Sequence, residues 1–303
     1  MRARLHRAPA ALAAVGCVLV LAACGPAAGP AAAPPTEGSA SSTTVPSPTQ
    51  TTSTSVPGPT STASATTTAA TRQARPGTEI LAPVPRAGAE PRVRFPANAA
   101  AVGAGANARV RTVPDAVWSR MVGYSWTPGC PVGRADLRYV TVNFWGFDGK
   151  RSRGAIVVHA AIATRTAQAF TRLYDQRFRI RQMRVMDRSW GHNPKGPGAN
   201  DYAAMDADNT SAFNCRYVGG QEERKQYSNH AYGRAIDVND WENPYRDEQG
   251  RIWPDQWFVA HRSPAAGVFP SSGSAAVRAF TGLGFRWGGL WAAPDYQHFE
   301  VSR

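Results

Sequence analysis

The chain has 303 residues, and its 34 lysines and arginines outnumber its 21 aspartates and glutamates, for a formal net charge of +13. A basic excess of this size suits an anionic partner. The sequence contains no basic helix and no aromatic stacking motif of the kind that accompanies nucleic-acid binding, so we expect no nucleic-acid partner.

The N-terminus has the pattern of an export signal. Three arginines in the first seven residues precede a largely apolar run from Ala8 to Ala23, which is short for a membrane-spanning helix. The run ends in Leu-Ala-Ala-Cys at 21–24, which resembles a bacterial lipobox, although an ordinary signal peptide with an incidental cysteine would also end in small residues. We therefore expect a lipoprotein signal at 1–23, a lipid on Cys24, and an exported protein anchored at the membrane and facing the cell wall.

A segment of low complexity follows the signal. Among residues 41–70, 22 of 30 are Ser, Thr or Pro and none is charged or aromatic, so the segment has nothing to bury against its ordering entropy. Residues 71–110 remain rich in Ala, Gly, Pro and Arg. We predict a disordered tether over 24–110 and one folded, monomeric domain over 111–303.

The first strong pattern in the predicted domain is a β-hairpin followed by a helix. Two alternating, β-branched runs within 138–160 flank Asp148 and Gly149, which indicates a hairpin turn. Apolar residues at helical spacing then predict a helix over 164–178, with Thr164 as its N-cap.

The rest of the domain alternates short strands, loops and one further helix. A strand is expected over 179–186, with Arg179 and Arg181 on its solvent face. A Gly- and Asn-rich loop over 189–209 follows, and a helix is expected near 273–282. Short strands close the chain. Clustered strands with helices between some of them predict an α+β domain with a small antiparallel sheet flanked by helices.

Four cysteines occur in the chain, and two of them remain for the folded domain. Cys17 leaves with the signal and Cys24 takes the lipid, so Cys130 and Cys215 are left in an oxidising compartment. An even count there favours a disulfide between Cys130 and Cys215. Two separate thiols are the alternative, because the sequence does not place them within bonding distance.

One short stretch, SNHAYGRAIDVN at 228–239, combines a histidine and a carboxylate that could share a metal. A turn at Gly233 would return the chain as a strand and bring His230 beside Asp237. His298 from the last strand would complete a set of two histidines and one carboxylate, as in catalytic zinc sites. By itself the spacing fits a surface histidine and a capping aspartate equally well.

Four blocks in this order resemble a known family. The sequence is similar to the VanY-like zinc D,D-carboxypeptidases and L-alanyl-D-glutamate endopeptidases, which act on peptidoglycan. The resemblance covers about 125–303, and it rests on GCPVGRADLRYVTVNFWGFDG (129–149), NTSAFNCR (209–216), SNHAYGRAID (228–237) and FRWGGLWAAPDYQHFEVS (285–302).

The resemblance implies a hedgehog/D,D-peptidase-like fold and assigns the residues of a zinc site. His230, Asp237 and His298 take the positions of the ligands of one zinc ion, and Asp295 that of the general base. Many carboxypeptidases of the family carry glutamate at this last position, whereas endolysin-like members carry aspartate, so exopeptidase and endopeptidase action both remain open. Zinc would activate a water, Asp295 would move its proton, and Arg216 would help to hold the oxyanion or a substrate carboxylate.

Further residues are candidates for substrate contact. Ser211 and Ser228 could donate hydrogen bonds to the substrate. Trp287 and Trp291 could wall the cleft, although large aromatic residues fit a core equally well. Arg216 could alternatively form a surface salt bridge.

The combined reading is a zinc-dependent peptidase that hydrolyses a peptide bond in peptidoglycan stem peptides. Two alternatives use the same fold: a wall-binding lipoprotein domain without turnover, and a zinc hydrolase of another amide. The ligand set and the acid at Asp295 favour an enzyme, because a binding domain needs no base.

The lipobox predicts a lipid-dependent location. Replacing Cys24→Ala removes the thiol that would carry the lipid, so we expect the protein to leave the membrane fraction and its acylated N-terminal peptide to disappear from the mass spectrum. A variant that stays membrane-bound, with no acylated peptide in the wild type, would show that the cysteine is incidental.

Overall fold

The computed structural model describes residues 96–262 and 266–303, all within one unit of the chain. The predicted signal, Cys24 and the tether up to residue 95 lie outside the described residues. Within them, the fold is α+β with small antiparallel sheets and few helices, which confirms the predicted class. None of the helices described is both long and apolar enough to cross a membrane.

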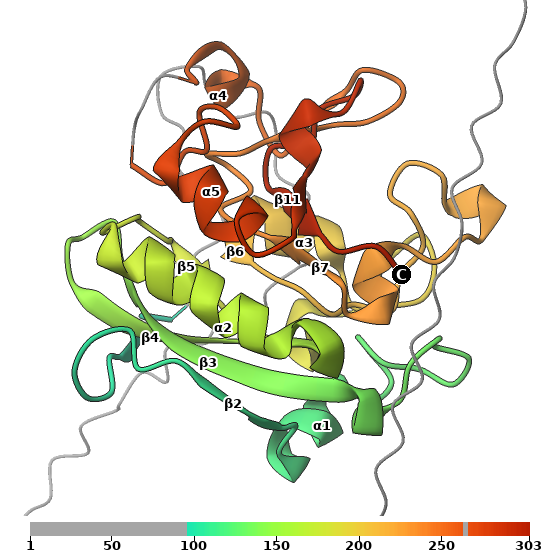
Figure 1. Ribbon diagram of the computed structural model, residues 1–303. Coiled ribbons are helices and arrows are strands. Elements are labelled where there is room, and N and C mark those ends of the chain that lie inside the picture. The colour runs from blue at the N-terminus through green and yellow to red at the C-terminus, as the bar shows by residue number, and fades with distance from the viewer. Residues whose placement is uncertain (1–95, 263–265) are drawn as a thin grey trace, which may run out of the picture. The chain divides into compact units, whose positions relative to one another are not determined.

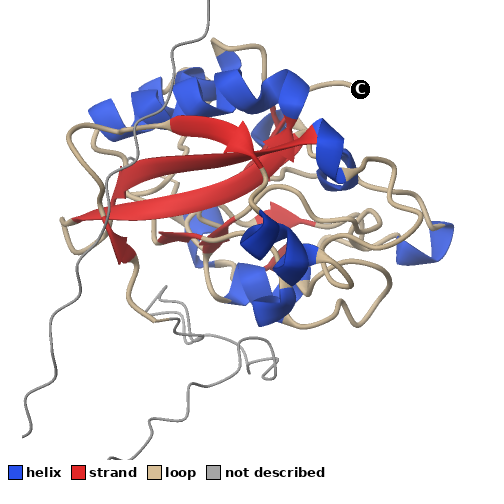
Figure 2. Cartoon of the chain, turned by 90° about the horizontal axis from the view of Figure 1, so that it is seen from below, coloured by secondary structure: helices blue, strands red, loops and turns tan. Residues whose placement is uncertain are grey.

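The largest sheet is built on the predicted hairpin. Its strands pair antiparallel in the order β1-β4-β3-β2, and they are β1 (Ala99–Ala100), β2 (Arg109–Thr112), β3 (Leu137–Trp145) and β4 (Arg151–His159). Strands β3 and β4 run side by side as the longest of the fold (Figure 2). The turn contains Asp148 and Gly149, where Gly149 has a φ of 78°. The hairpin prediction is therefore confirmed.

Helix α2 (Ala160–Asp175) lies along β3 and β4, with α5 (Ala275–Thr281) next to it (Figure 1). It begins earlier than predicted because His159 ends β4 and caps the helix, its Nδ1 accepting from the amide of Ala161 at 3.1 Å. Thr164 is therefore inside the helix and is not the N-cap. The main core lies between these helices and the sheet, and its larger members include Val140, Val142, Ile156, Ile162, Phe170, Leu173, Phe280 and Phe299.

A second core covers part of the opposite face of the sheet. Helix α1 (Asp115–Met121) buries Met121 there against Leu137 and Val157, and Phe213 joins them. Leu137 and Tyr139 of β3 both face this core because side chains two residues apart on a strand share a face.

Smaller elements complete the fold. They are the parallel pair β5 (Gln182–Met183) and β6 (Asn209–Thr210), the antiparallel sheet β10 (Arg286–Trp287), β11 (His298–Glu300) and β7 (Ala235–Asp237), the hairpin β8 (Tyr245–Arg246) and β9 (Ile252–Trp253), and the helices α3 (Asp201–Asp206) and α4 (Trp257–Ala260). The predicted C-terminal helix over 273–282 corresponds to α5, which Ser274 caps.

The strand predicted over 179–186 is mostly irregular. Only β5 forms, and Arg181 does not face solvent. Its guanidinium pairs with the buried carboxylates of Asp208 and Glu242, each at 3.1 Å. The prediction of a solvent face from the two-residue spacing of Arg179 and Arg181 is therefore wrong for Arg181. Two buried acids that are distant in the sequence attract its side chain inward.

Ordered structure begins before the predicted domain boundary at residue 111. Strand β1 pairs with β4, and the side chain of Asn143 accepts from the amide of Val102 and donates to the carbonyl of Gly105. The small residues of this stretch resemble a tether in composition, but their backbone groups find partners in the sheet. The folded domain thus includes at least residues 96–110.

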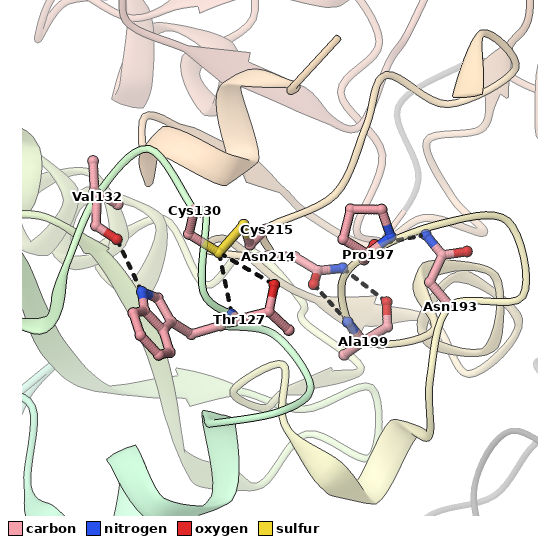
Figure 3. Close-up of a disulfide and its surroundings, with 9 residues drawn as sticks. Thr127, Cys130, Val132, Asn193, Pro197, Ala199, Asn214 and Cys215 are labelled. Atoms are coloured by element: carbon pink, nitrogen blue, oxygen red, sulfur yellow. Dashed lines mark hydrogen bonds between the residues drawn. A yellow bond between two sulfur atoms is a disulfide. The ribbon is translucent and has the colours of Figure 1, made fainter. Parts of the chain in front are cut away.

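Cys130 and Cys215 form a disulfide with a Cα–Cα distance of 5.9 Å, as predicted (Figure 3). It joins the loop before β3 to the segment that follows β6. Beside it, Asn214 exchanges two hydrogen bonds with the backbone of Ala199, at 2.9 and 3.0 Å. The disulfide and this amide hold the segment from both sides.

Loss of the disulfide should cost global stability. It closes a loop over a sequence separation of 85 residues. Removing such a loop constraint from the unfolded chain should lower the free energy of unfolding by about 2 to 5 kcal/mol. We expect this in denaturant titrations of the double variant Cys130→Ser and Cys215→Ser. Wild type treated with a reductant serves as the control and should show the same decrease. Equal stability of the variant and the oxidised wild type would contradict a stabilising disulfide.

Candidate metal centre and active site

Two strands and one turn bring His230, Asp237 and His298 together. In the register of β11 against β7, His298 lies directly opposite Asp237. His230 comes from the short 3₁₀ turn Asn229–Tyr232 that precedes β7. All three side chains are buried, and one ligand atom from each lies within 4.8 Å of the others.

Gly233 makes the turn between His230 and Asp237 possible. It has a left-handed conformation with φ of 64°, and its carbonyl accepts from the amide of His159 at 2.8 Å. A Cβ at this position would lie 2.7 Å from that nitrogen, so both the dihedral angle and the close approach require glycine. This is the turn that the sequence predicts.

Hydrogen bonds to the outer ring nitrogens set the direction of both imidazoles. His230 donates from Nδ1 to the carbonyl of Ala212 at 2.7 Å, and His298 faces Glu300 through Nε2 at 3.4 Å. The inner nitrogens, Nε2 of His230 and Nδ1 of His298, then lie 3.3 Å apart and 3.0 and 2.9 Å from the Asp237 carboxylate. Second partners of this kind orient metal-binding histidines.

The donor set fits a divalent cation. Two imidazoles and one carboxylate that converge at a buried point are the ligands that zinc takes in catalytic sites. The electrostatics also fit a cation. The pKa values of Asp237 and His298 both show that a positive charge is favoured where the three side chains converge. Burial alone would raise the pKa of Asp237, but His230 and His298 lower it well below its usual range. Burial would lower the pKa of His298, but Asp237 and Glu300 raise it to about 10.

Asp295 lies beside this cluster without joining it. Its Oδ2 is 4.0 Å from Nδ1 of His298, and its buried Oδ1 has no hydrogen-bond partner. Burial, opposed by the charge of His298 and reinforced by that of Asp237, raises the pKa of Asp295 to about 7. Gly288 permits the approach of the loop, since a Cβ there would lie 2.6 Å from the carbonyl oxygen of Asp295. The side chain is therefore a polar group held at the cluster with an unused oxygen.

Arg216 also lies beside Asp237. Its Nε pairs with Oδ2 of Asp201 at 2.7 Å, and its Nη2 lies 4.0 Å from Oδ2 of Asp237. The residue before it, Cys215, is held by the disulfide. The guanidinium is thus fixed at the cluster, and the alternative of a surface salt bridge is wrong because the side chain is largely buried.

A cavity of about 380 Å³ opens onto these groups. Arg216, His230, Asp295 and His298 line it, and Asp237 contacts both histidines. The remaining lining includes Tyr202, Tyr217, Ser228, Tyr245, Trp291 and Glu300. The cavity is large enough for a short peptide segment.

Of the four residues predicted to contact substrate or to wall the cleft, Ser228 and Trp291 line the cavity, and the hydroxyl of Ser228 has no hydrogen-bond partner. Ser211 instead pairs its backbone with that of Asp237 through two hydrogen bonds of 2.9 Å. Trp287 is in the main core and donates from Nε1 to the carbonyl of Tyr296. The ring centroid of Trp291 lies 5.1 Å from that of His298. Of the two alternatives that the sequence left open for Trp287, the structure therefore shows the core position.

Sequence reasoning missed Glu300, which contacts His298, Asn229 and Arg286. Burial alone would raise the pKa of Glu300, but the hydrogen bonds from His298 and Asn229 help to lower it to about 2. The two-residue spacing from His298 within one strand could have revealed it, because such residues share a face. Asp201 and Tyr245 carry no comparable signal in the sequence.

Histidines and carboxylates gathered in a cavity of an α+β fold are an arrangement that metal-dependent hydrolases use. Residues 222–301 match the family model described as D-alanyl-D-alanine carboxypeptidase. The match confirms the resemblance to the D,D-peptidase family and supports a peptidase of the D-alanyl-D-alanine carboxypeptidase type. No curated protein sequence and no solved structure matches the chain.

Proposed function

We propose that the chain is a zinc-dependent peptidase that hydrolyses a peptide bond in peptidoglycan stem peptides. The observation that carries this proposal is the cross-strand pair of Asp237 and His298, which meets His230 at a buried point beside the unpaired carboxyl oxygen of Asp295. The family match supplies the class of substrate.

In this proposal His230 Nε2, His298 Nδ1 and the Asp237 carboxylate hold one zinc ion. When bound, zinc supplies Lewis-acid activation of the scissile carbonyl and of a water. Asp295 accepts the proton of the attacking water through its free oxygen and returns it to the leaving amine. Its separation from the ligand atoms suits a base that does not bind the metal.

Arg216 supplies positive charge on the substrate side. The ion pair with Asp201 fixes its side chain, so little ordering entropy is lost when the guanidinium contacts an oxyanion or a carboxylate. Ser228 offers a hydroxyl, and Trp291 gives the cavity an apolar wall.

The proposal includes the place where the enzyme works. Peptidoglycan lies outside the cytoplasmic membrane, so the protein must be exported, and a lipid on Cys24 would keep it at the membrane. The disulfide between Cys130 and Cys215 suits such an oxidising compartment. The wall-binding and other-amide alternatives would both leave the peptide bonds within the stem of defined muropeptides uncut.

Metal binding and catalysis should separate on mutation. His298→Ala removes a ligand, so we expect zinc content and muropeptide cleavage to fall together. Asp295→Asn keeps the size of the side chain and the ligands, so zinc should remain while the rate falls by about 10²- to 10⁴-fold. Zinc per chain is measured by elemental analysis and cleavage by mass spectrometry of defined muropeptides. Full activity of Asp295→Asn, or full zinc in His298→Ala, contradicts the assignment at that residue.

Glu300 should matter for metal affinity through His298. Glu300→Gln weakens the acceptor that faces Nε2 of His298, so we expect zinc affinity to fall by about 10- to 100-fold. The affinity is measured by competition with a chromophoric chelator. Glu223→Gln removes the same charge at an exposed position and serves as the matched control, which should bind zinc as the wild type does. Unchanged affinity in Glu300→Gln would mean that the contact does not orient the ligand.

A further inference from the structure

Three arginines share the face of the four-stranded sheet that α2 does not cover. Arg109 and Arg111 of the edge strand β2 lie opposite Thr141 and Tyr139 of β3, and cross-strand partners project from the same face. Arg153 of β4 donates to the hydroxyl of Thr141 at 2.5 Å, so it projects from this face as well. We call Arg109, Arg111 and Arg153 the arginine face.

A hollow of about 330 Å³ opens at the arginine face. Tyr139, Thr141 and Arg153 line it from the sheet, while residues of α1 and of the segment 183–189 line it from the sides. It shares no lining residue with the cavity at the metal centre. The proposed peptidase reaction uses none of these groups.

Positive charge exceeds negative charge at the hollow, because Arg120, Arg153 and Arg184 line it and Asp187 is the one acid among the described lining residues. Arg153 is held by neutral acceptors, namely the Thr141 hydroxyl, the carbonyl of Asn107 at 2.8 Å and the side chain of Asn143 at 3.1 Å. Neither Arg109 nor Arg111 has a carboxylate partner in the described part of the chain.

The acid that lines the hollow is already paired, because Asp187 accepts from Arg120 at 2.7 Å. On α1, Asp115 pairs with Arg134 at 2.5 Å. The uncompensated charge is felt at Arg153, whose pKa is lowered first by burial and then by the charge of Arg111. A bound anion would remove this repulsion.

Charged residues on an edge strand can also serve only to prevent strand-to-strand aggregation. That role could explain Arg109 and Arg111, because β2 is an exposed edge strand. It does not explain Arg153, which lies on the inner strand β4 and lines a hollow. Arg153 is half-buried and held in one orientation by three hydrogen bonds. A fixed guanidinium at a hollow is better suited to recognising a ligand.

We propose that the arginine face binds a linear phosphate-bearing polymer. The planar guanidinium matches a phosphate group in a bidentate manner, and the three residues are all arginine. Arg109 and Arg111 are two residues apart on a strand, about 7 Å along it, and thus form a row that can follow successive anionic groups. Because Arg153 lies in a hollow, a polymer chain reaches it more readily than a flat bilayer does.

The test measures binding of inorganic polyphosphate to the full chain by calorimetry, with no metal or peptide present. The outcome is therefore independent of the proposed peptidase. Replacing Arg109→Ala and Arg111→Ala together removes two exposed contacts, so we expect the dissociation constant at low salt to rise by about tenfold and the salt dependence of binding to weaken. Arg109→Lys with Arg111→Lys keeps the charge and should lose less.

The matched control is Arg172→Ala with Arg278→Ala, which removes the same charge from exposed positions on α2 and α5. We expect it to bind polyphosphate as the wild type does. Equal weakening in both double variants would mean that net charge alone attracts the polymer, and it would overturn the proposal. Inorganic phosphate binding as tightly as polyphosphate, or phosphatidylglycerol vesicles binding in preference to it, would overturn the choice of a polymer.

Discussion

The candidate site depends on one extended segment, residues 211–216, whose backbone and side chains are held on all sides. Ser211 pairs with the backbone of Asp237, and the carbonyl of Ala212 accepts from the His230 ring. The disulfide at Cys215 then fixes the position from which Arg216 reaches the cavity. This one segment positions the strand of Asp237, the ring of His230 and the guanidinium of Arg216. A shift of its backbone would therefore move all three together.

The electrostatic balance of the site follows from this arrangement. Asp237 is buried between two imidazoles and one guanidinium, and a buried carboxylate is stable only when such partners surround it. The positive charges of His298 and Arg216 also act on Asp295, whose Oδ1 has no hydrogen-bond partner. A cation at the convergence point would compensate the charge of Asp237, so the charges and the geometry favour the same occupant.

Local patterns predicted the elements whose partners are close in sequence. The hairpin of β3 and β4 follows from alternation around Asp148 and Gly149, and the helix after it from its apolar spacing. The prediction failed where a distant group decided the outcome. His159 caps α2 because strand β4 ends at that residue, and Arg181 turns inward because Asp208 and Glu242 are buried beside it.

The sequence by itself determined the α+β class and the turn at Gly233, because these depend on local spacing and residue type. It favoured a disulfide between Cys130 and Cys215, but only the tertiary structure shows that the two lie within bonding distance. It also indicated His230, Asp237 and His298 as a group, through motifs similar to a known family. Only the tertiary structure decided that Trp291 rather than Trp287 lines the cavity and that Glu300 supports His298. Which side of a short strand or loop faces a cavity depends on the packing of segments far apart in the chain, and spacing along one segment carries no record of that packing.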